Sequence, residues 1–197
     1  MEYRLDTNLL LGYLTRWDTF LKRKVHCIAC GGTAMTLLGI KASTKDVDFM
    51  VPEKKEYDYL IRTIRRLGYK NVRGWGWARL GEPFIFDLFP GNRIHTTELL
   101  NSPLEEGRHT LVKELAHVYL GVLNDYDLIV SKLFRGETVD FEDTLQLMTA
   151  HKDSVDFGIL KNHFFETLKY HPVGEERIKG NWDTFETRLQ KGKNHDR

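Results

Sequence analysis

The sequence predicts an α/β core followed by a smaller helical region, and three observations support this. Residues 25–51, VHCIACGGTAMTLLGIKASTKDVDFMV, are typical of a strand, a glycine turn, a helix, a loop and a second strand. Aromatic and β-branched residues punctuated by glycine and proline follow from Tyr69 onward, as expected for further strands. Beyond Asn124, apolar residues recur at helical spacing. We therefore expect an α/β domain over residues 1–123 and a helical region over residues 124–197.

The composition limits the size and the environment of the protein. With 197 residues, 41% of them hydrophobic, the chain can form one α/β core and a smaller helical part. Its 29 Lys and Arg residues nearly balance 28 Asp and Glu residues, so no global basic field directs it to nucleic acid, although local patches remain possible. The amino-terminal residues MEYRLDTN do not resemble a signal peptide, and no apolar run is long enough to span a bilayer. We expect a cytoplasmic protein without membrane association.

The first quarter of the chain is expected to form a helix, a strand, a short helix and a second strand. Apolar residues at helical spacing indicate a helix within Leu5–Lys24, and the first strand begins at Val25. The glycine turn Gly31-Gly32 ends this strand and allows a short helix over about Thr33–Leu38. A loop then leads to the second strand, Asp46–Val51.

The middle of the chain combines one helix with further strands. Residues 57–67 carry apolar side chains at positions i, i+3, i+4 and i+7, which indicates a helix that covers one face of the sheet, and Gly68 supplies its end. Phe84–Phe89 is an apolar strand interrupted by one charge. Residues 92–107 are expected to be a loop with one short helix, and Val118–Leu123 the last strand.

The carboxyl-terminal region is expected to consist of helices. The predicted helices are Asp127–Phe134, Asp140–Ala150, Phe157–Tyr170 and Trp182–Leu189. The last seven residues, KGKNHDR, contain too few apolar side chains to pack and are predicted to be a mobile tail.

The two cysteines, Cys27 and Cys30, have the C-x-x-C spacing of some redox and zinc sites. In a strand, however, this spacing places the two sulfur atoms on opposite faces, and the sequence has no second pair to complete a tetrahedral zinc site. We expect both to be small buried residues.

Three aspartates are candidates for a metal site. Side chains alternate along a strand, so Asp46 and Asp48 share a face of the second strand. Asp87 is the one charge in an apolar strand and needs a partner, because burying an unpaired carboxylate is costly. Like charges held this close beside a glycine turn favour a cation between them. The alternatives are ordinary structural roles: Asp46 capping a turn, Asp48 paired with a nearby lysine, and Asp87 facing water at a sheet edge.

These features resemble the nucleotidyltransferase superfamily with the DNA-polymerase-β-like minimal core. The superfamily is marked by a Gly-Gly or Gly-Ser turn, an Asp-x-Asp pair about one helix later and a third carboxylate on a further strand. The stretches G-G-T-A-M, T-K-D-V-D-F and D-L-I-V-S-K-L look like its small prokaryotic branch, which includes uncharacterised and toxin–antitoxin-associated members. The resemblance covers residues 25–150. It implies a mixed sheet with flanking helices.

The resemblance also implies a metal-dependent reaction. In such enzymes three carboxylates hold two Mg²⁺ ions, with Mn²⁺ as an alternative, between a nucleoside triphosphate such as ATP and an acceptor hydroxyl. By this resemblance Asp46 and Asp48 would bridge the two metals. Asp87 would ligate the metal on the acceptor side and help to deprotonate the hydroxyl.

Further residues are expected to bind the nucleotide. Gly31 and Gly32 would allow the backbone to approach the phosphates, and Thr33 would add a hydroxyl near the helix start. An arginine often precedes the Asp pair in this branch, whereas here Lys45 and Lys41 are the basic residues present. Lys132, which matches a family lysine, would reach the triphosphate from the solvent edge of its helix; alternatively, it is an ordinary solvated lysine.

The predicted function is nucleotidyl transfer to a hydroxyl of RNA, such as tRNA, or of protein, with a cognate antitoxin or toxin as a possible partner. The alternatives are a catalytically inactive nucleotide-binding or antitoxin-like protein, and a small-molecule transferase of the aminoglycoside-modifying type. A basic groove would support tRNA, but the basic residues in question also suit a solvated helix face and turn. They are Arg62, Arg65, Arg66, Lys70 and Arg73.

Overall fold

The structure, a computed structural model, describes residues 3–171 and 173–195, without the side chains of residues 193–195. The chain divides into two units. The first comprises Met1–Ile94 and Asn101–Asn124, and the second comprises His95–Leu100 and Asp125–Arg197. The main division between the two units follows Asn124. The assignment of His95–Leu100 to the second unit depends on contacts between residues distant in sequence, which no local pattern contains.

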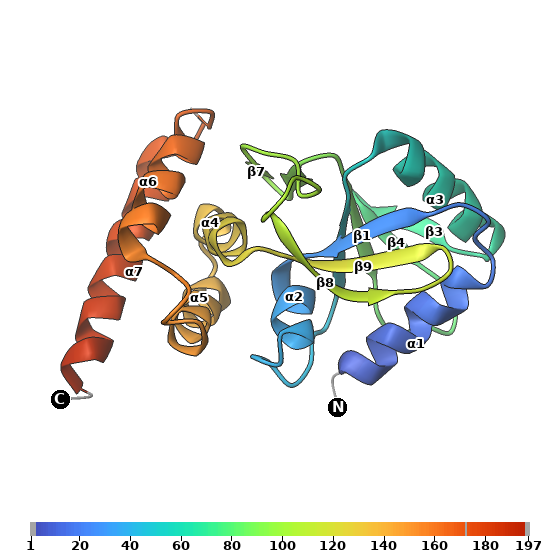
Figure 1. The fold of residues 1–197 in the computed structure, drawn as a ribbon, viewed down its shortest axis with the longest axis horizontal. Coiled ribbons are helices and arrows are strands. Elements are labelled where there is room, and N and C mark those ends of the chain that lie inside the picture. The colour runs from blue at the N-terminus through green and yellow to red at the C-terminus, as the bar shows by residue number, and fades with distance from the viewer. Residues whose placement is uncertain (1–2, 172, 196–197) are drawn as a thin grey trace. The chain divides into compact units, whose positions relative to one another are not determined.

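A mixed seven-stranded sheet forms the centre of the first unit, in agreement with the α/β prediction (Figure 1). Its strand order is β3-β4-β5-β2-β1-β9-β8. Strand β1 pairs antiparallel with β2 and parallel with β9, and β2 pairs parallel with β5. The bounds are β1 (Val25–Ala29), β2 (Val47–Val51), β3 (Lys70–Arg73), β4 (Gly76–Ala78), β5 (Phe86–Pro90), β8 (His109–Glu114) and β9 (Val118–Leu123), and the short β6 (Arg93–Ile94) also belongs to this unit.

Two helices, α1 (Thr7–Asp18) and α3 (Lys54–Arg66), cover the same face of this sheet. Trp17 of α1 packs on Phe86 of β5, with ring centroids 4.4 Å apart. Arg65 of α3 lies over Trp77, and Trp77 is the register partner of Phe86 on the neighbouring strand. Register partners project to the same face, so both helices pack on that face. Figure 1 shows α1 and α3 beside the sheet.

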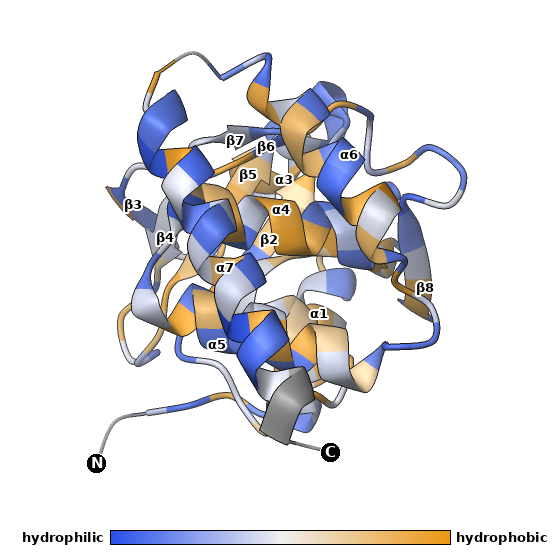
Figure 2. Cartoon of the chain, turned by 90° about the vertical axis from the view of Figure 1, so that its left-hand side faces the viewer, coloured by the Kyte–Doolittle hydropathy of each residue, from blue (hydrophilic) through white to orange (hydrophobic). Residues whose placement is uncertain are grey.

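The second unit is helical, as predicted, and has an aromatic core. Its elements are β7 (Thr97–Glu98), α4 (Asp125–Arg135), α5 (Thr138–Ala150), α6 (Phe157–Leu168) and α7 (Glu175–His195). Phe164 of α6 packs on Trp182 of α7 at 4.8 Å between ring centroids, and Phe134 of α4 packs on Phe164 at 5.2 Å. Hydrophobic residues are concentrated in the middle of α4, whereas α7 carries many hydrophilic ones (Figure 2).

Several predicted elements differ from those in the structure. Strand β2 begins at Val47, so Asp46 precedes it, and the short helix α2 (Gly31–Leu37) begins at the glycine turn itself. Strand β8 was not predicted, because its residues are mostly exposed and lack a periodic apolar pattern. Residues 92–107 contain two short strands, β6 and β7, where one short helix was expected.

The last helix is much longer than its apolar pattern indicates. Helix α7 extends from Glu175 to His195 and so includes most of the segment predicted as a mobile tail, whereas residues 196 and 197 lie outside the described residues. Gly180 and Gly192 within it lower the helix propensity, which is why sequence patterns underestimate its length. No helix among the described residues is long and apolar enough to cross a bilayer.

The cysteine prediction is confirmed. Cys27 and Cys30 are both buried. Burial, with a smaller contribution from the nearby Glu56 carboxylate, raises the pKa of the Cys27 thiol to about 12. This thiol is therefore not ionised near neutral pH, in keeping with a packing role.

Candidate active site

Asp48 and Asp87 are neighbours on the face of the sheet opposite α1 and α3. They are register partners on the parallel strands β2 and β5. Phe86 contacts α1, so the alternation of side chains directs Asp87 to the opposite face. Register partners on parallel strands project to the same side, so the Asp48 side chain lies on the same face as that of Asp87. Both residues are buried, with exposed fractions of 8% and 7%.

A single guanidinium connects Asp87 to the third predicted carboxylate. Arg73 Nη2 lies 3.3 Å from Asp87 Oδ2 and 3.7 Å from Asp46 Oδ1. Asp46, just ahead of β2, is thereby part of the same cluster, although it lies outside the strand where it was expected. The cluster, meaning Asp46, Asp48 and Asp87, thus has a positively charged group beside two of its members.

The surroundings of Asp87 disfavour its charged form. Burial raises the pKa of its carboxyl above the ordinary value, Arg73 opposes this rise, and the negative charge of Asp46 adds to it. Desolvation is the largest cause. Asp87 is therefore a stronger base than an exposed aspartate.

The glycine turn is closely joined to the Asp48 side of the cluster. Gly31 has φ +56°, and a Cβ atom at this position would overlap Asp48 Oδ2. Thr33 Oγ1 accepts a hydrogen bond from the Asp48 backbone N–H at 2.8 Å and donates to the Asp46 carbonyl at 3.3 Å. Only glycine gives both the positive φ and the close approach. The turn, Asp48 and the backbone of Asp46 therefore form one local structure. A Cβ at Gly32 would lie 2.7 Å from Thr44 Oγ1.

Two further residues complete the site and were not assigned to it from the sequence. Arg73 was considered only as a member of a basic groove, and Gly76 only as punctuation between strands. A Cβ at Gly76 would lie 3.0 Å from Asp87 Oδ1, so Gly76 leaves the space in which the carboxylate sits. Gly76 is the register partner of Asp87. This pairing joins strands that are separate in the sequence, so no local pattern identifies Gly76 as part of the site.

The chemistry of the cluster suits a divalent cation. Carboxylate oxygens are the preferred ligands of Mg²⁺ and Mn²⁺, and Arg73 shows that positive charge is accommodated beside Asp46 and Asp87. Within residues 3–171 and 173–195, no three His, Cys, Asp or Glu side chains are already arranged to hold a metal ion.

The two predicted nucleotide-binding lysines have different surroundings. Lys45 is exposed in the loop directly before Asp46. Lys132 is only 2% exposed, with Nζ 2.7 Å from Asp143 Oδ2 and 3.8 Å from Asp140 Oδ1. The expected position of Lys132 at the solvent edge of its helix is therefore wrong. The carboxylates of Asp140 and Asp143 orient its ammonium group inside the second unit.

Comparisons with known proteins concern both the sequence and the fold. The sequence model of a family described as "Nucleotidyltransferase of unknown function (DUF6036)" matches residues 16–193. No curated protein sequence matches the chain.

Three similar solved structures are nucleotidyltransferases or resemble them. A solution structure of the antibiotic-resistance factor ANT(2'')-Ia has a TM-score of 0.51 and 15% identity, covering 98% of each chain. A crystal structure of ANT(2'')-Ia with adenylyl-2''-tobramycin has a TM-score of 0.49 and 13% identity, covering 91% of this chain and 96% of the other. An antigenic nucleotidyltransferase-like protein from Paracoccidioides brasiliensis has a TM-score of 0.46 and 12% identity, covering 90% and 95%. At these identities the likeness concerns the fold.

Proposed function

Because the chain belongs to the DUF6036 family of nucleotidyltransferases of unknown function, we propose that it transfers a nucleoside monophosphate from an NTP to a hydroxyl acceptor and releases pyrophosphate. The observation that carries this proposal is the pairing of Asp48 with Asp87 beside the Gly31 turn. We propose RNA, such as tRNA, as the acceptor, with protein as the alternative. ATP is one candidate NTP, and the reaction would take place in the cytoplasm.

The three carboxylates would hold two Mg²⁺ ions, or Mn²⁺ in their place. When bound, such ions neutralise charge on the triphosphate and lower the pKa of the attacking hydroxyl. Asp46, Asp48 and Asp87 would supply the carboxylate ligands of these ions. Asp87 would also accept the proton of the acceptor hydroxyl.

Other residues would orient the triphosphate. Gly31 and Gly32 would let the backbone approach the phosphates, Thr33 would hold Asp48 in place through its backbone, and Lys45 would contribute a cation from its loop. Lys132 would reach the triphosphate only by leaving Asp143. For Lys132 we therefore consider a structural role first.

Arg73 would leave the cluster when the metal binds. Its side chain is 58% exposed, so its guanidinium can move into solvent without crossing the core. In the metal-free protein it offsets the repulsion between the carboxylates of Asp46 and Asp87. Arg73 thus competes with the divalent ions for the same oxygens.

The reaction is tested by incubating the protein with each α-labelled NTP, Mg²⁺ and total cell RNA or lysate. We expect label to appear in RNA and to depend on Mg²⁺. Label in protein or in a small molecule would instead show that the acceptor belongs to that class. If no NTP gave label in any of the three fractions, the proposal would be contradicted.

Divalent ions are expected to stabilise the protein. A ligand that binds only the folded state adds about 2.7 kcal/mol at 100 times its dissociation constant, so Mg²⁺ or Mn²⁺ should raise the melting temperature measured after EDTA treatment. The increase should be lost in Asp87→Asn and kept in Asp58→Asn, which removes a carboxylate from α3. An equal increase in both variants would show that the ions act elsewhere.

A non-catalytic nucleotide-binding protein, such as an antitoxin-like partner, is the second candidate. The observation that favours it is the contact of Arg73 with two carboxylates of the cluster. If Arg73 permanently occupies the cation position, divalent ions will not stabilise the protein and no label will be transferred. Operation with a cognate toxin or antitoxin stays a prediction under either candidate.

A further inference from the structure

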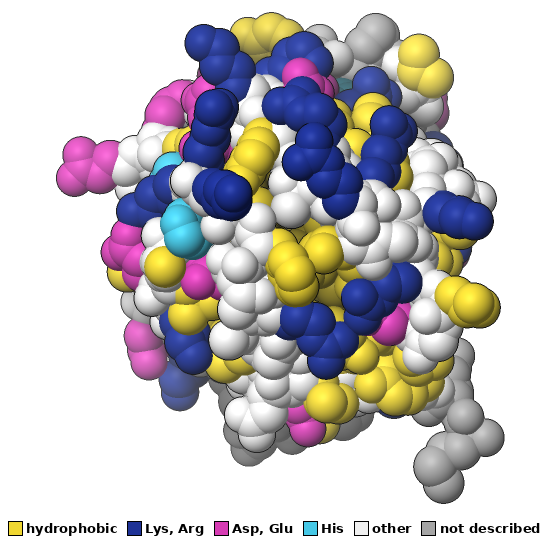
Figure 3. Space-filling view, turned by 90° about the vertical axis from the view of Figure 1, so that its right-hand side faces the viewer, with side chains coloured by type: hydrophobic (Ala, Val, Ile, Leu, Met, Phe, Trp, Pro, Cys, Tyr) yellow, Lys and Arg dark blue, Asp and Glu magenta, His cyan; other side chains and the backbone are white. Residues whose placement is uncertain are grey.

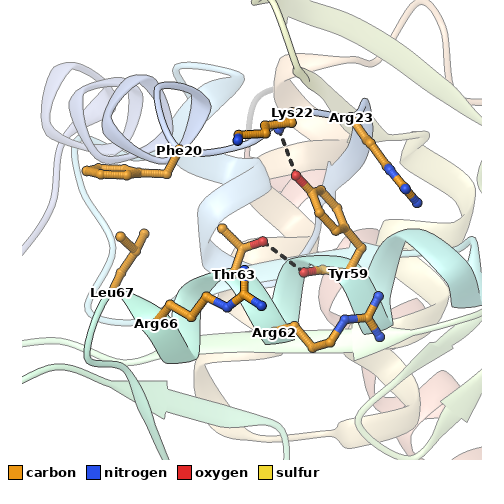
Figure 4. A pocket seen from close by; sticks show the side chains of 8 residues that line it. All are labelled: Phe20, Lys22, Arg23, Tyr59, Arg62, Thr63, Arg66 and Leu67. Atoms are coloured by element: carbon orange, nitrogen blue, oxygen red, sulfur yellow. Dashed lines mark hydrogen bonds between the residues drawn. The ribbon is translucent and has the colours of Figure 1, made fainter.

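A pocket of about 390 Å³ lies in the first unit between the segment that joins α1 to β1 and the second half of α3. The joining segment contributes an aromatic ring and two cations, and α3 contributes two arginines on one helix face together with a tyrosine (Figure 4). The lining residues are Phe20, Lys22, Arg23, Tyr59, Arg62, Thr63, Arg66 and Leu67.

The pocket concentrates positive charge in a chain whose charges otherwise nearly balance. Four of its lining residues are cationic and none is acidic. Within the described part of the chain, Lys22, Arg23, Arg62 and Arg66 form no ion pair with a carboxylate, whereas Lys24 pairs with Glu114. On the face of the first unit shown in Figure 3, Lys and Arg side chains clearly outnumber acidic ones. Four like charges around one hollow favour a polyanionic ligand.

The backbone around the pocket is held in place. The Lys22 backbone N–H donates to the Tyr59 hydroxyl at 2.7 Å, and the Tyr59 ring lies under the Arg23 guanidinium at 5.7 Å. One turn earlier in α3, the carboxylate of Glu56 accepts the backbone N–H of His26 at 2.8 Å. The two sides of the pocket are therefore fixed to each other before any ligand binds, which lowers the entropy cost of binding.

The pocket has an apolar end next to its cationic part. Phe20 and Leu67 face each other at one end of the view in Figure 4, and Phe20 is 51% exposed. An exposed aromatic ring provides a stacking surface for a nucleobase, while the adjacent cations suit the phosphates that join successive nucleotides. This combination is typical of surfaces that bind single-stranded nucleic acid.

The pocket lies away from the carboxylate cluster. Lys22 and Arg23 precede β1, whereas Gly31 follows its opposite end, and a strand of five residues is about 16 Å long. A small acceptor cannot contact both sites at once, but a polymer can occupy the pocket while its reactive hydroxyl lies elsewhere. From these features we infer that the pocket binds the phosphodiester backbone of single-stranded RNA; the choice of RNA rests on the proposed function.

The inference is tested by fluorescence anisotropy with a labelled single-stranded RNA of about 12 nucleotides, in EDTA, over a series of salt concentrations. Four phosphate contacts predict a slope of log K against log salt concentration of about −3. The variant Arg62→Ala/Arg66→Ala should bind about 10-fold or more weakly, with a slope reduced in size by about 1.4. The matched control, Lys54→Ala/Lys55→Ala, removes two exposed charges from the same helix outside the pocket and should bind as the wild type does.

Several results would overturn the inference. Equal weakening in the two double variants would mean that only the overall charge matters. Binding of AMP, inorganic phosphate or poly-glutamate as tight as that of the RNA would assign the pocket to a mononucleotide, to phosphate or to an acidic protein segment. We expect unchanged melting temperatures for both double variants, because all four substituted residues are exposed. Unchanged melting temperatures exclude misfolding as the cause of weaker binding.

The same assay separates this inference from the proposed reaction. Binding in EDTA requires no metal, so it reports on the pocket independently of nucleotidyl transfer. Pocket-dependent RNA binding without any label transfer would support the pocket and contradict the reaction. Label transfer to RNA that is unaffected by Arg62→Ala/Arg66→Ala would support the reaction and contradict the pocket.

Discussion

Replacement of Asp48 by asparagine is expected to abolish nucleotidyl transfer and to leave the stability of the metal-free protein nearly unchanged. The backbone of residue 48 should keep its place in Asp48→Asn, because its N–H donates to Thr33 Oγ1 and its carbonyl accepts a hydrogen bond from the Cys30 N–H at 3.1 Å. The side chain lies beside Asp87 on the face of the sheet opposite α1 and α3. Loss of a group that acts directly on the reacting charges costs about 10³-fold or more in rate.

The sign of the stability change distinguishes a catalytic from a structural aspartate. Asp48→Asn removes one of three neighbouring negative charges, so it relieves repulsion, and the melting temperature in EDTA should stay constant or rise. Asp58→Asn, on the exposed surface of α3, is the matched control and should retain full activity. A strongly lowered melting temperature for Asp48→Asn in EDTA would indicate that this carboxylate has a structural role.

The central part of the fold was predictable because its patterns are local. The strand, glycine turn, helix and strand over residues 25–51 depend on neighbouring residues, and all four appear in the structure. The alternation of side chains likewise predicts which faces Asp48 and Asp87 occupy on their own strands. That these two strands are adjacent and in register was expected only from the family resemblance.

The remaining features depend on contacts between distant parts of the chain. Arg73 reaches the carboxylates because β4, which forms a hairpin with β3, pairs with β5, and no local pattern contains this pairing. The basic pocket combines residues 20–23 with residues 59–67, so the sequence showed only the arginines of α3. Of the five cations considered as a basic groove, Arg62 and Arg66 line the pocket, while Arg65 stacks on Trp77 and Arg73 contacts the acidic cluster.

Helical spacing was also misleading for Lys132, because it treats every polar residue beside an apolar stripe as solvent-exposed. Helix α4 is covered on several sides, and even its charged residues Asp127 and Lys132 are buried. A buried lysine requires a carboxylate partner, and the helix that supplies one, α5, follows in the sequence with Asp140 and Asp143. The charges at residues 132, 140 and 143 were visible in the sequence, but their burial was not.

The structure therefore changes the expected consequence of Lys132→Ala. Removal of the ammonium group withdraws the positive charge 2.7 Å from the buried Asp143 carboxylate, and breaking a buried ion pair from one side costs about 3–5 kcal/mol. For a chain of this length the melting temperature should fall by about 6–20 °C. Lys152→Ala, which removes an exposed lysine from the same unit, is the control and should change it little.

A second variant separates folding from nucleotide binding. In Lys132→Met/Asp143→Leu both members of the ion pair are replaced by apolar side chains, so much of the stability lost in Lys132→Ala should return. The KM for NTP of this double variant then reports on nucleotide contact in a folded protein. A KM equal to that of the wild type would assign Lys132 to the core of the second unit. If Lys132→Ala instead left the melting temperature unchanged and raised the KM for NTP, Lys132 would be assigned as a phosphate ligand. Its ammonium group would then contribute to nucleotide binding and not to folding stability.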